Sequence, residues 1–114
     1  MQTGSCHCGA VKFTAQGVID QAIECNCSHC SCKGFLFWFV PRESFAVTAG
    51  ADKLTTYTFN KHVILHQFCS VCGCQPFGLG VKPDGTKMAA INVRCVDDID
   101  LANIKRVPVN GKEF

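Results

Sequence analysis

Short apolar segments separated by turn residues run along most of the chain, and their patterns are those of β-strands. Residues 10–15 alternate apolar and polar side chains, as in a strand with one buried face. Residues 35–40 are apolar throughout, which predicts a strand covered on both faces and ended by Pro41. Further strands are predicted over residues 22–25, 45–48, 54–59, 62–68, 77–81 and 87–94.

Helical periodicity is weak throughout the sequence. Its best window is residues 98–104, and residues 42–44 are long enough for a single helical turn only. No linker, low-complexity run or internal repeat divides the chain. We therefore predict an all-β fold with at most one short helix, organised as a single domain over residues 1–114.

The composition and the first residues bear on where the protein resides. Hydrophobic residues make up 47% of the chain and charged residues 18%, as in an ordinary globular protein. Residues 1–5 carry no basic cluster and lead directly into Cys6, so no signal peptide is expected. The apolar run over residues 35–40 is far shorter than the roughly 20 residues of a membrane-spanning helix. We expect a cytoplasmic protein with reduced thiols and no membrane partner.

The chain contains ten cysteines, an unusual density for 114 residues. In a cytoplasmic protein this density indicates metal ligands or thiol chemistry, and in a secreted one it indicates disulfides. Disulfides stay an alternative, but clustering without a secretion signal favours metal, and zinc is preferred because no iron-specific pattern is present. The clusters are Cys6-His-Cys8, Cys25-Asn-Cys27-Ser-His-Cys30-Ser-Cys32 and Cys69-Ser-Val-Cys72-Gly-Cys74, and Cys95 stands alone.

The first and third clusters suit one shared ion. Cys69 and Cys72 precede a glycine in the pattern of a zinc knuckle, in which the backbone amides point toward sulfur. Cys6 and Cys8 face the same side of an extended segment. Two such pairs joined across the fold supply four sulfur ligands, and a site with every position filled is structural.

The middle cluster allows two interpretations. Cys25, Cys27 and Cys30 lie within six residues and can supply three ligands from one loop. Three protein ligands leave a fourth position for water or substrate, which is the arrangement of catalytic zinc. Alternatively Cys32, Cys74 or Cys95 closes this site, and the second ion is structural too.

The net charge points to no particular partner. The formal value is +2 with neutral cysteines. Seven thiolates on two divalent ions would lower it by three, to −1. We therefore expect no nucleic-acid partner.

The cysteine motifs together resemble the glutathione-dependent formaldehyde-activating enzyme family, whose domain is shared with centromere protein V. The likeness covers nearly the whole chain. The resemblance implies a β-tent of packed antiparallel sheets stapled by zinc, with two zinc ions per chain. The motifs that carry it are Cys6-His-Cys-Gly-Ala-Val-Lys-Phe13, Glu24-Cys-Asn-Cys-Ser-His-Cys30, Tyr57-Thr-Phe-Asn60 and Phe68-Cys-Ser-Val-Cys-Gly73 followed by Pro76-Phe77.

The resemblance also implies roles for the cysteines and an activity. The structural zinc would be bound by Cys6, Cys8, Cys69 and Cys72, and the catalytic zinc by Cys25, Cys27 and Cys30. The activity would be that of a carbon-sulfur lyase that forms S-(hydroxymethyl)glutathione from glutathione and formaldehyde. A small-molecule thiol such as glutathione is thus the expected partner. Competing hypotheses are a zinc-stabilised interaction module without catalysis and a thiol redox sensor using Cys32, Cys74 or the middle cluster.

Histidines and basic residues are further candidates for functional groups. His29 could carry protons, but a loop histidine between ligands is more often a solvated spacer. His62 and His66 are expected to lie on the surface of a strand, and Cys95 to be a small buried residue. The cations that could meet a glutathione carboxylate are Lys33, Arg42, Lys61 and Arg94.

Overall fold

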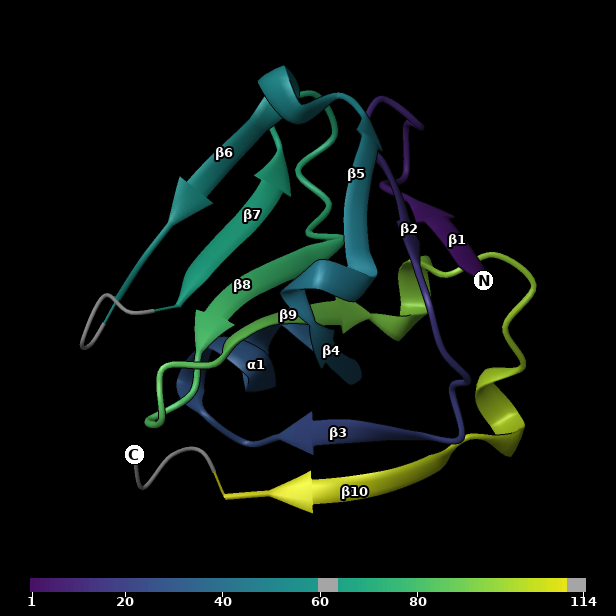
Figure 1. Cartoon of the computed structure of the whole chain (residues 1–114), viewed down its shortest axis with the longest axis vertical. Helices are drawn as coiled ribbons and strands as arrows, with labels where there is room; N and C mark the ends of the chain where they lie inside the picture. Colours follow the sequence, from purple (N-terminus) through teal and green to yellow (C-terminus); the bar gives the residue numbers. More distant parts are fainter. Residues whose placement is uncertain (60–63, 111–114) are drawn as a thin grey trace.

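A computed structural model of the chain describes residues 1–59 and 64–110 and shows two packed β-sheets (Figure 1). One sheet has the strand order β1-β2-β5, and the other has the order β10-β3-β4-β9-β8-β7-β6. One six-residue α-helix, α1 (Ser28–Lys33), lies within these residues. The strands are β1 (Gln2–Ser5), β2 (Lys12–Ala15), β3 (Gln21–Cys25), β4 (Phe37–Pro41), β5 (Phe45–Ala49), β6 (Leu54–Tyr57), β7 (Leu65–Cys69), β8 (Phe77–Val81), β9 (Lys87–Asn92) and β10 (Lys105–Val109).

The expected all-β fold of packed sheets with at most one short helix is confirmed. In Figure 1 the small sheet and the β6–β7 hairpin lean toward each other above β3 and β10, which gives a tent-like outline. Within the described residues, no helix has the length and apolar character that crossing a bilayer requires.

One pair of strands departs from the expected antiparallel arrangement. β10 runs parallel to β3, with Lys105 opposite Gln21 and Val109 opposite Cys25. Parallel neighbours need a long connection, and here most of the chain lies between the two strands. The pairing places the end of β10 beside the first cysteine of the middle cluster.

Several predicted elements match the structure closely, and two strands have no counterpart in the prediction. β8 covers the predicted residues 77–81, and residues 42–44 form a single 3-10 turn. Of the strand predicted over residues 62–68, residues 62 and 63 lie outside the described part, and in the structure β7 runs from Leu65 to Cys69. β1 and β10 are weak in β-forming residues, and each forms by pairing with a strand that the sequence does predict.

The strand predicted to be covered on both faces is covered only in part. Trp38 and Val40 of β4 face the core between the two sheets, and on the other face Phe37 packs against Phe35. Farther along that face, Phe39 is 48% exposed. α1 and the residues after it cover the sheet beside Phe37, so the expectation is wrong at Phe39.

The core forms where the small sheet rests on the large one. Phe13 of β2 is 1% exposed and lies against Phe45 and Phe77, at ring-centroid distances of 5.8 and 6.4 Å. Ala89 and Ile91 of β9 belong to the same buried cluster. Phe13 thus joins strands of both sheets.

We expect Phe13→Ala to lower the free energy of unfolding by about 3–5 kcal/mol, because it removes a fully buried ring from between the sheets. Urea denaturation of the metal-loaded protein measures this loss. Phe39→Ala is the matched control and should cost less than about 1 kcal/mol. Equal losses for the two variants would contradict this account of the core.

Candidate functional site

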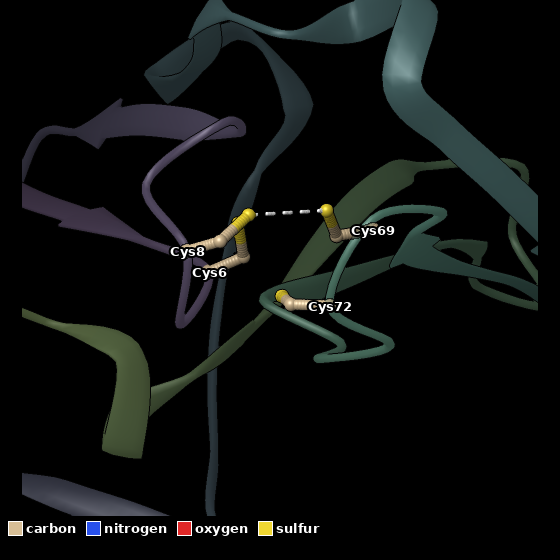
Figure 2. A group of neighbouring side chains, drawn as sticks. All are labelled: Cys6, Cys8, Cys69 and Cys72. Atoms are coloured by element: carbon tan, nitrogen blue, oxygen red, sulfur yellow. Dashed lines mark hydrogen bonds between the residues drawn. The ribbon is translucent and has the colours of Figure 1, made fainter.

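Four cysteine sulfurs converge from two turns that are distant in sequence (Figure 2). Cys6 and Cys8 lie between β1 and β2, whereas Cys69 ends β7 and Cys72 follows in the next turn. The four Sγ atoms lie within 4.8 Å of one another. The Cys6–Cys8 and Cys8–Cys69 separations are 3.6 and 3.8 Å. Four thiolates at ~2.3 Å from one ion form a tetrahedron with edges of ~3.8 Å, so this group could hold a metal ion.

The two turns are built alike, with a left-handed glycine after the second cysteine. Gly9 has a φ of 81° and Gly73 a φ of 80°, values that side chains other than glycine rarely adopt. The amide of Gly9 donates to the carbonyl of Cys6, and the amide of Gly73 donates to that of Cys69. These hydrogen bonds curl each turn so that its two sulfurs face the same point.

Backbone amides stabilise negative charge on these sulfurs. The amide of Val11 donates to Cys6 Sγ at 3.4 Å, and the amide of Val71 donates to Cys69 Sγ at 3.4 Å. A hydrogen bond from the Cys74 amide is the largest factor that lowers the pKa of Cys72, to about 6. The turn therefore favours the thiolate form at Cys72. At Cys8 a hydrogen bond from the Ala10 amide acts to lower the pKa, but burial and the neighbouring thiols outweigh it and raise the pKa to about 11.

The middle cluster brings three sulfurs together where β3 ends and α1 begins. Cys25 ends β3, Cys27 is the N-cap of α1, and Cys30 lies inside this helix. Their Sγ atoms lie within 4.8 Å of one another, so this group could also hold a metal ion. The prediction of a single loop is corrected here, because Cys27 Sγ accepts the Cys30 amide at 3.3 Å and thereby starts a helix.

The sulfurs of the three-cysteine group differ in their environments. Burial raises the pKa of Cys30. For Cys27, burial acts to raise the pKa, but the hydrogen bond from the Cys30 amide and the neighbouring thiols outweigh it and the pKa is lowered. Cys27 is thus more easily deprotonated than Cys30 without a metal.

The remaining three cysteines lie outside both groups. Within residues 1–59 and 64–110, no fourth side chain that could ligate an ion joins Cys25, Cys27 and Cys30. Cys32 is exposed on α1. Cys74 lies 3.6 Å from Cys95, Sγ to Sγ, and packs beside the four-cysteine group instead.

A cavity of about 480 Å³ opens beside the three-cysteine group. Its walls come from the end of β3, from α1 and from the end of β10, which the parallel pairing brings alongside. At its rim Asn26 Nδ2 donates to Asn110 Oδ1 at 2.7 Å. The lining residues are Glu24, Cys25, Asn26, Cys30, Ser31, Gly34, Phe35, Pro108, Val109 and Asn110.

His29 occupies an aromatic cluster, which contradicts its expected role as a solvated spacer. Its ring lies 4.2 Å from the ring of His66 and 5.3–5.6 Å from those of Phe35, Tyr57 and Phe59. Its Nδ1 is buried and has no hydrogen-bond partner among the described residues. Hydrophobic patterning cannot reveal this cluster, because its members come from a helix and from a distant hairpin.

His66 is buried rather than on the surface. It is 6% exposed, and its Nδ1 lies 3.4 Å from the side-chain nitrogen of Gln75. Burial, and after it the charges of His29 and Lys33, lowers the pKa of His66 to about 4. His62, its expected companion, lies outside the described residues.

The candidate cations differ in their positions. Arg94 donates from Nε to the carbonyl of Gly34, a residue that lines the cavity, at 3.1 Å. Arg42 donates to the carbonyls of Met88 and Gly80, away from this cavity. Lys61 lies outside the described residues.

The fold and the two groups of sulfurs define a small β-protein with two places that could each hold a metal ion. The family model described as glutathione-dependent formaldehyde-activating enzyme matches residues 1–108, and the chain belongs to this family. The crystal structure of a Rhodobacter sphaeroides protein is similar, with a TM-score of 0.81 and 27% sequence identity. That similarity covers 93% of this chain and 97% of the other. The resemblance inferred from the cysteine motifs is confirmed.

We expect His66 to make the fold sensitive to acid. Its pKa of about 4 in the folded state lies below the ordinary value of 6.5, so the unfolded chain binds the additional proton as the pH falls from 6.5 toward 4. Stability should therefore be complete above pH 6.5 and fall by about 2 kcal/mol between pH 7 and 5 through this group alone.

Denaturation of the parent and of His66→Phe at both pH values measures this contribution. The variant keeps an aromatic ring and should lose less stability on acidification. Identical pH slopes for His66→Phe and the parent would contradict the assignment.

Proposed function

We propose that this protein is a zinc-dependent carbon-sulfur lyase that joins glutathione, or a related small thiol, to formaldehyde. The product would be the S-hydroxymethyl adduct, and the same site would catalyse the reverse reaction. The observation that carries the proposal is a three-sulfur group that opens onto a cavity of about 480 Å³. Membership of the formaldehyde-activating family supports it.

Zinc is the ion that we assign to both cysteine groups. Thiolate sulfur is a preferred zinc donor, and the sulfur separations of 3.6 and 3.8 Å in the four-cysteine group suit a tetrahedral site. Cys6, Cys8, Cys69 and Cys72 would saturate a structural ion. Cys25, Cys27 and Cys30 would leave one position free on the second. Zinc held there by Cys25, Cys27 and Cys30 would supply a Lewis acid that lowers the pKa of an incoming thiol.

The cavity suits a small polar thiol. Its volume lies in the range of about 300–1,000 Å³ that is usual for small-molecule sites. The Glu24 carboxylate, which pairs with Arg106 at 3.7 Å, would also accept from an ammonium group, and Asn26 and Asn110 offer amides to carboxyl or peptide groups. Phe35 forms an apolar wall beside Cys30. These residues would hold a tripeptide thiol with its sulfur toward the three cysteines.

The chemistry requires orientation more than a strong acid or base. The thiol loses its proton, its sulfur bonds to the carbonyl carbon, the carbon–oxygen π bond opens, and the oxygen takes up a proton. No electron donor or acceptor takes part. The walls of the cavity would contribute by holding the sulfur beside the carbonyl carbon, because orientation replaces a bimolecular encounter.

The two groups should respond differently to loss of one sulfur. We expect Cys72→Ser to lower the free energy of unfolding by at least ~3 kcal/mol, because binding at a saturated site contributes directly to folding. We expect Cys27→Ser to cost less than about 1 kcal/mol. Serine is a good N-cap, so its hydroxyl can replace the sulfur that begins α1. Metal content and urea denaturation measure both effects. Equal destabilisation by the two substitutions would contradict the division into structural and catalytic groups.

The activity itself is tested by mixing the zinc-loaded protein with glutathione and formaldehyde. Adduct formation is followed by nuclear magnetic resonance against the uncatalysed rate. The parent should accelerate the reaction, and Cys27→Ser should return it to the background while remaining folded. Cys32→Ser, which changes an exposed cysteine on the same helix, should retain the parent rate. Rates equal to the background for the parent would end the enzyme proposal.

A further inference from the structure

Cys74 and Cys95 form a pair of thiols outside both candidate metal groups. Their Sγ atoms are 3.6 Å apart although the residues are 21 positions apart in the chain. Both side chains are half-buried, so neither is sealed from small reagents. At this distance the two sulfurs are in van der Waals contact, and bond formation requires an approach of roughly 1.5 Å, to a length of ~2.05 Å.

Hydrogen bonds hold the backbone segments of the pair side by side. The amide of Asn92 donates to the carbonyl of Pro76 at 2.9 Å, and its side chain donates to the carbonyl of Gln75 at 3.0 Å. The carbonyl of Cys74 accepts the amide of Cys69 at 2.9 Å. These bonds join the segment after Cys74 to the segment before Cys95, so the two cysteines are held close to each other by the backbone.

We propose that Cys74 and Cys95 are a site of reversible disulfide formation by hydroperoxides, separate from both metal groups. One sulfur attacks the peroxide, the oxygen–oxygen bond breaks, and a sulfenic acid and water form. The second sulfur displaces the hydroxyl group as another water. Two thiols thus lose two electrons and two protons to one hydrogen peroxide. Two molecules of a small thiol reverse the reaction and become its disulfide.

The location gives this disulfide a structural consequence. Cys74 ends the turn that carries Cys69 and Cys72, and Cys95 lies in the 3-10 turn after β9. A bond between them would close a loop through β8 and β9 and tie that turn to the large sheet. It would also constrain the unfolded chain, so the oxidised protein should have a thermal midpoint several degrees higher.

The test is to treat the zinc-loaded protein with one equivalent of hydrogen peroxide. Free thiols are then blocked under denaturing conditions, and tryptic peptides are mapped by mass spectrometry. Peptide 62–87 should be linked to peptide 95–105, because trypsin does not cleave the Lys82–Pro83 bond, with fragmentation placing the link between Cys74 and Cys95. Metal content should be unchanged, and dithiothreitol should remove the link.

Three results would overturn the proposal. The first is that no disulfide forms, and the second is that a disulfide of Cys69 or Cys72 forms first. The third is that zinc is released when the Cys74–Cys95 bond forms. Cys95→Ser should lose the linkage and the shift in thermal midpoint, whereas Cys32→Ser should keep both. The linkage map of the parent decides the matter even if Cys95→Ser fails to fold. None of these readouts depends on the proposed lyase activity.

Discussion

The convergence of two cysteine turns on one point is the constraint on which the rest of the fold depends. Cys6 and Cys69 are 2% and 0% exposed and form part of an apolar cluster with Val11 and Phe77. Buried thiolates would repel one another and lose hydration unless a cation compensates their charge. A shared ion would therefore link the small sheet to the end of β7. It would also hold the two sheets together around a core that a chain of 114 residues can make only modest in size.

The three-cysteine group lies in a different physical environment. Its sulfurs stand at the end of β3 and on a six-residue helix, next to a cavity rather than inside an apolar cluster. The helix is too short to be stable alone, and the sulfur of Cys27 at its N-cap contributes to its formation. The same sulfur thus caps the helix and belongs to the three-cysteine group. The cavity exists because β10 returns in parallel beside β3 and supplies Val109 and Asn110 as a wall.

Cysteine spacing is informative because ligands two or three positions apart share one turn. The sequence could therefore indicate which sulfurs lie together within each turn. The contact between the two histidines has no such local signal. The ring centroids of His29 and His66 are 4.2 Å apart, but His29 lies in α1 and His66 lies in β7. The contact of Cys95 with Cys74 is also invisible to local patterns, because Cys95 stands alone in the sequence. The pairing of β8 with β9 and the turns beyond these strands bring the two cysteines together.

Local patterns by themselves determined the all-β character of this protein, most of its strands and the membership of each cysteine turn. These features depend on side-chain alternation and on contacts within a few residues. The tertiary structure alone decided the parallel β3–β10 pair, the cavity beside Cys25 and Cys30, the burial of His66 and the contact of Cys74 with Cys95. Each of these joins segments far apart in the chain. Such contacts are set by strand register and by the packing of the two sheets, which no short stretch of sequence encodes.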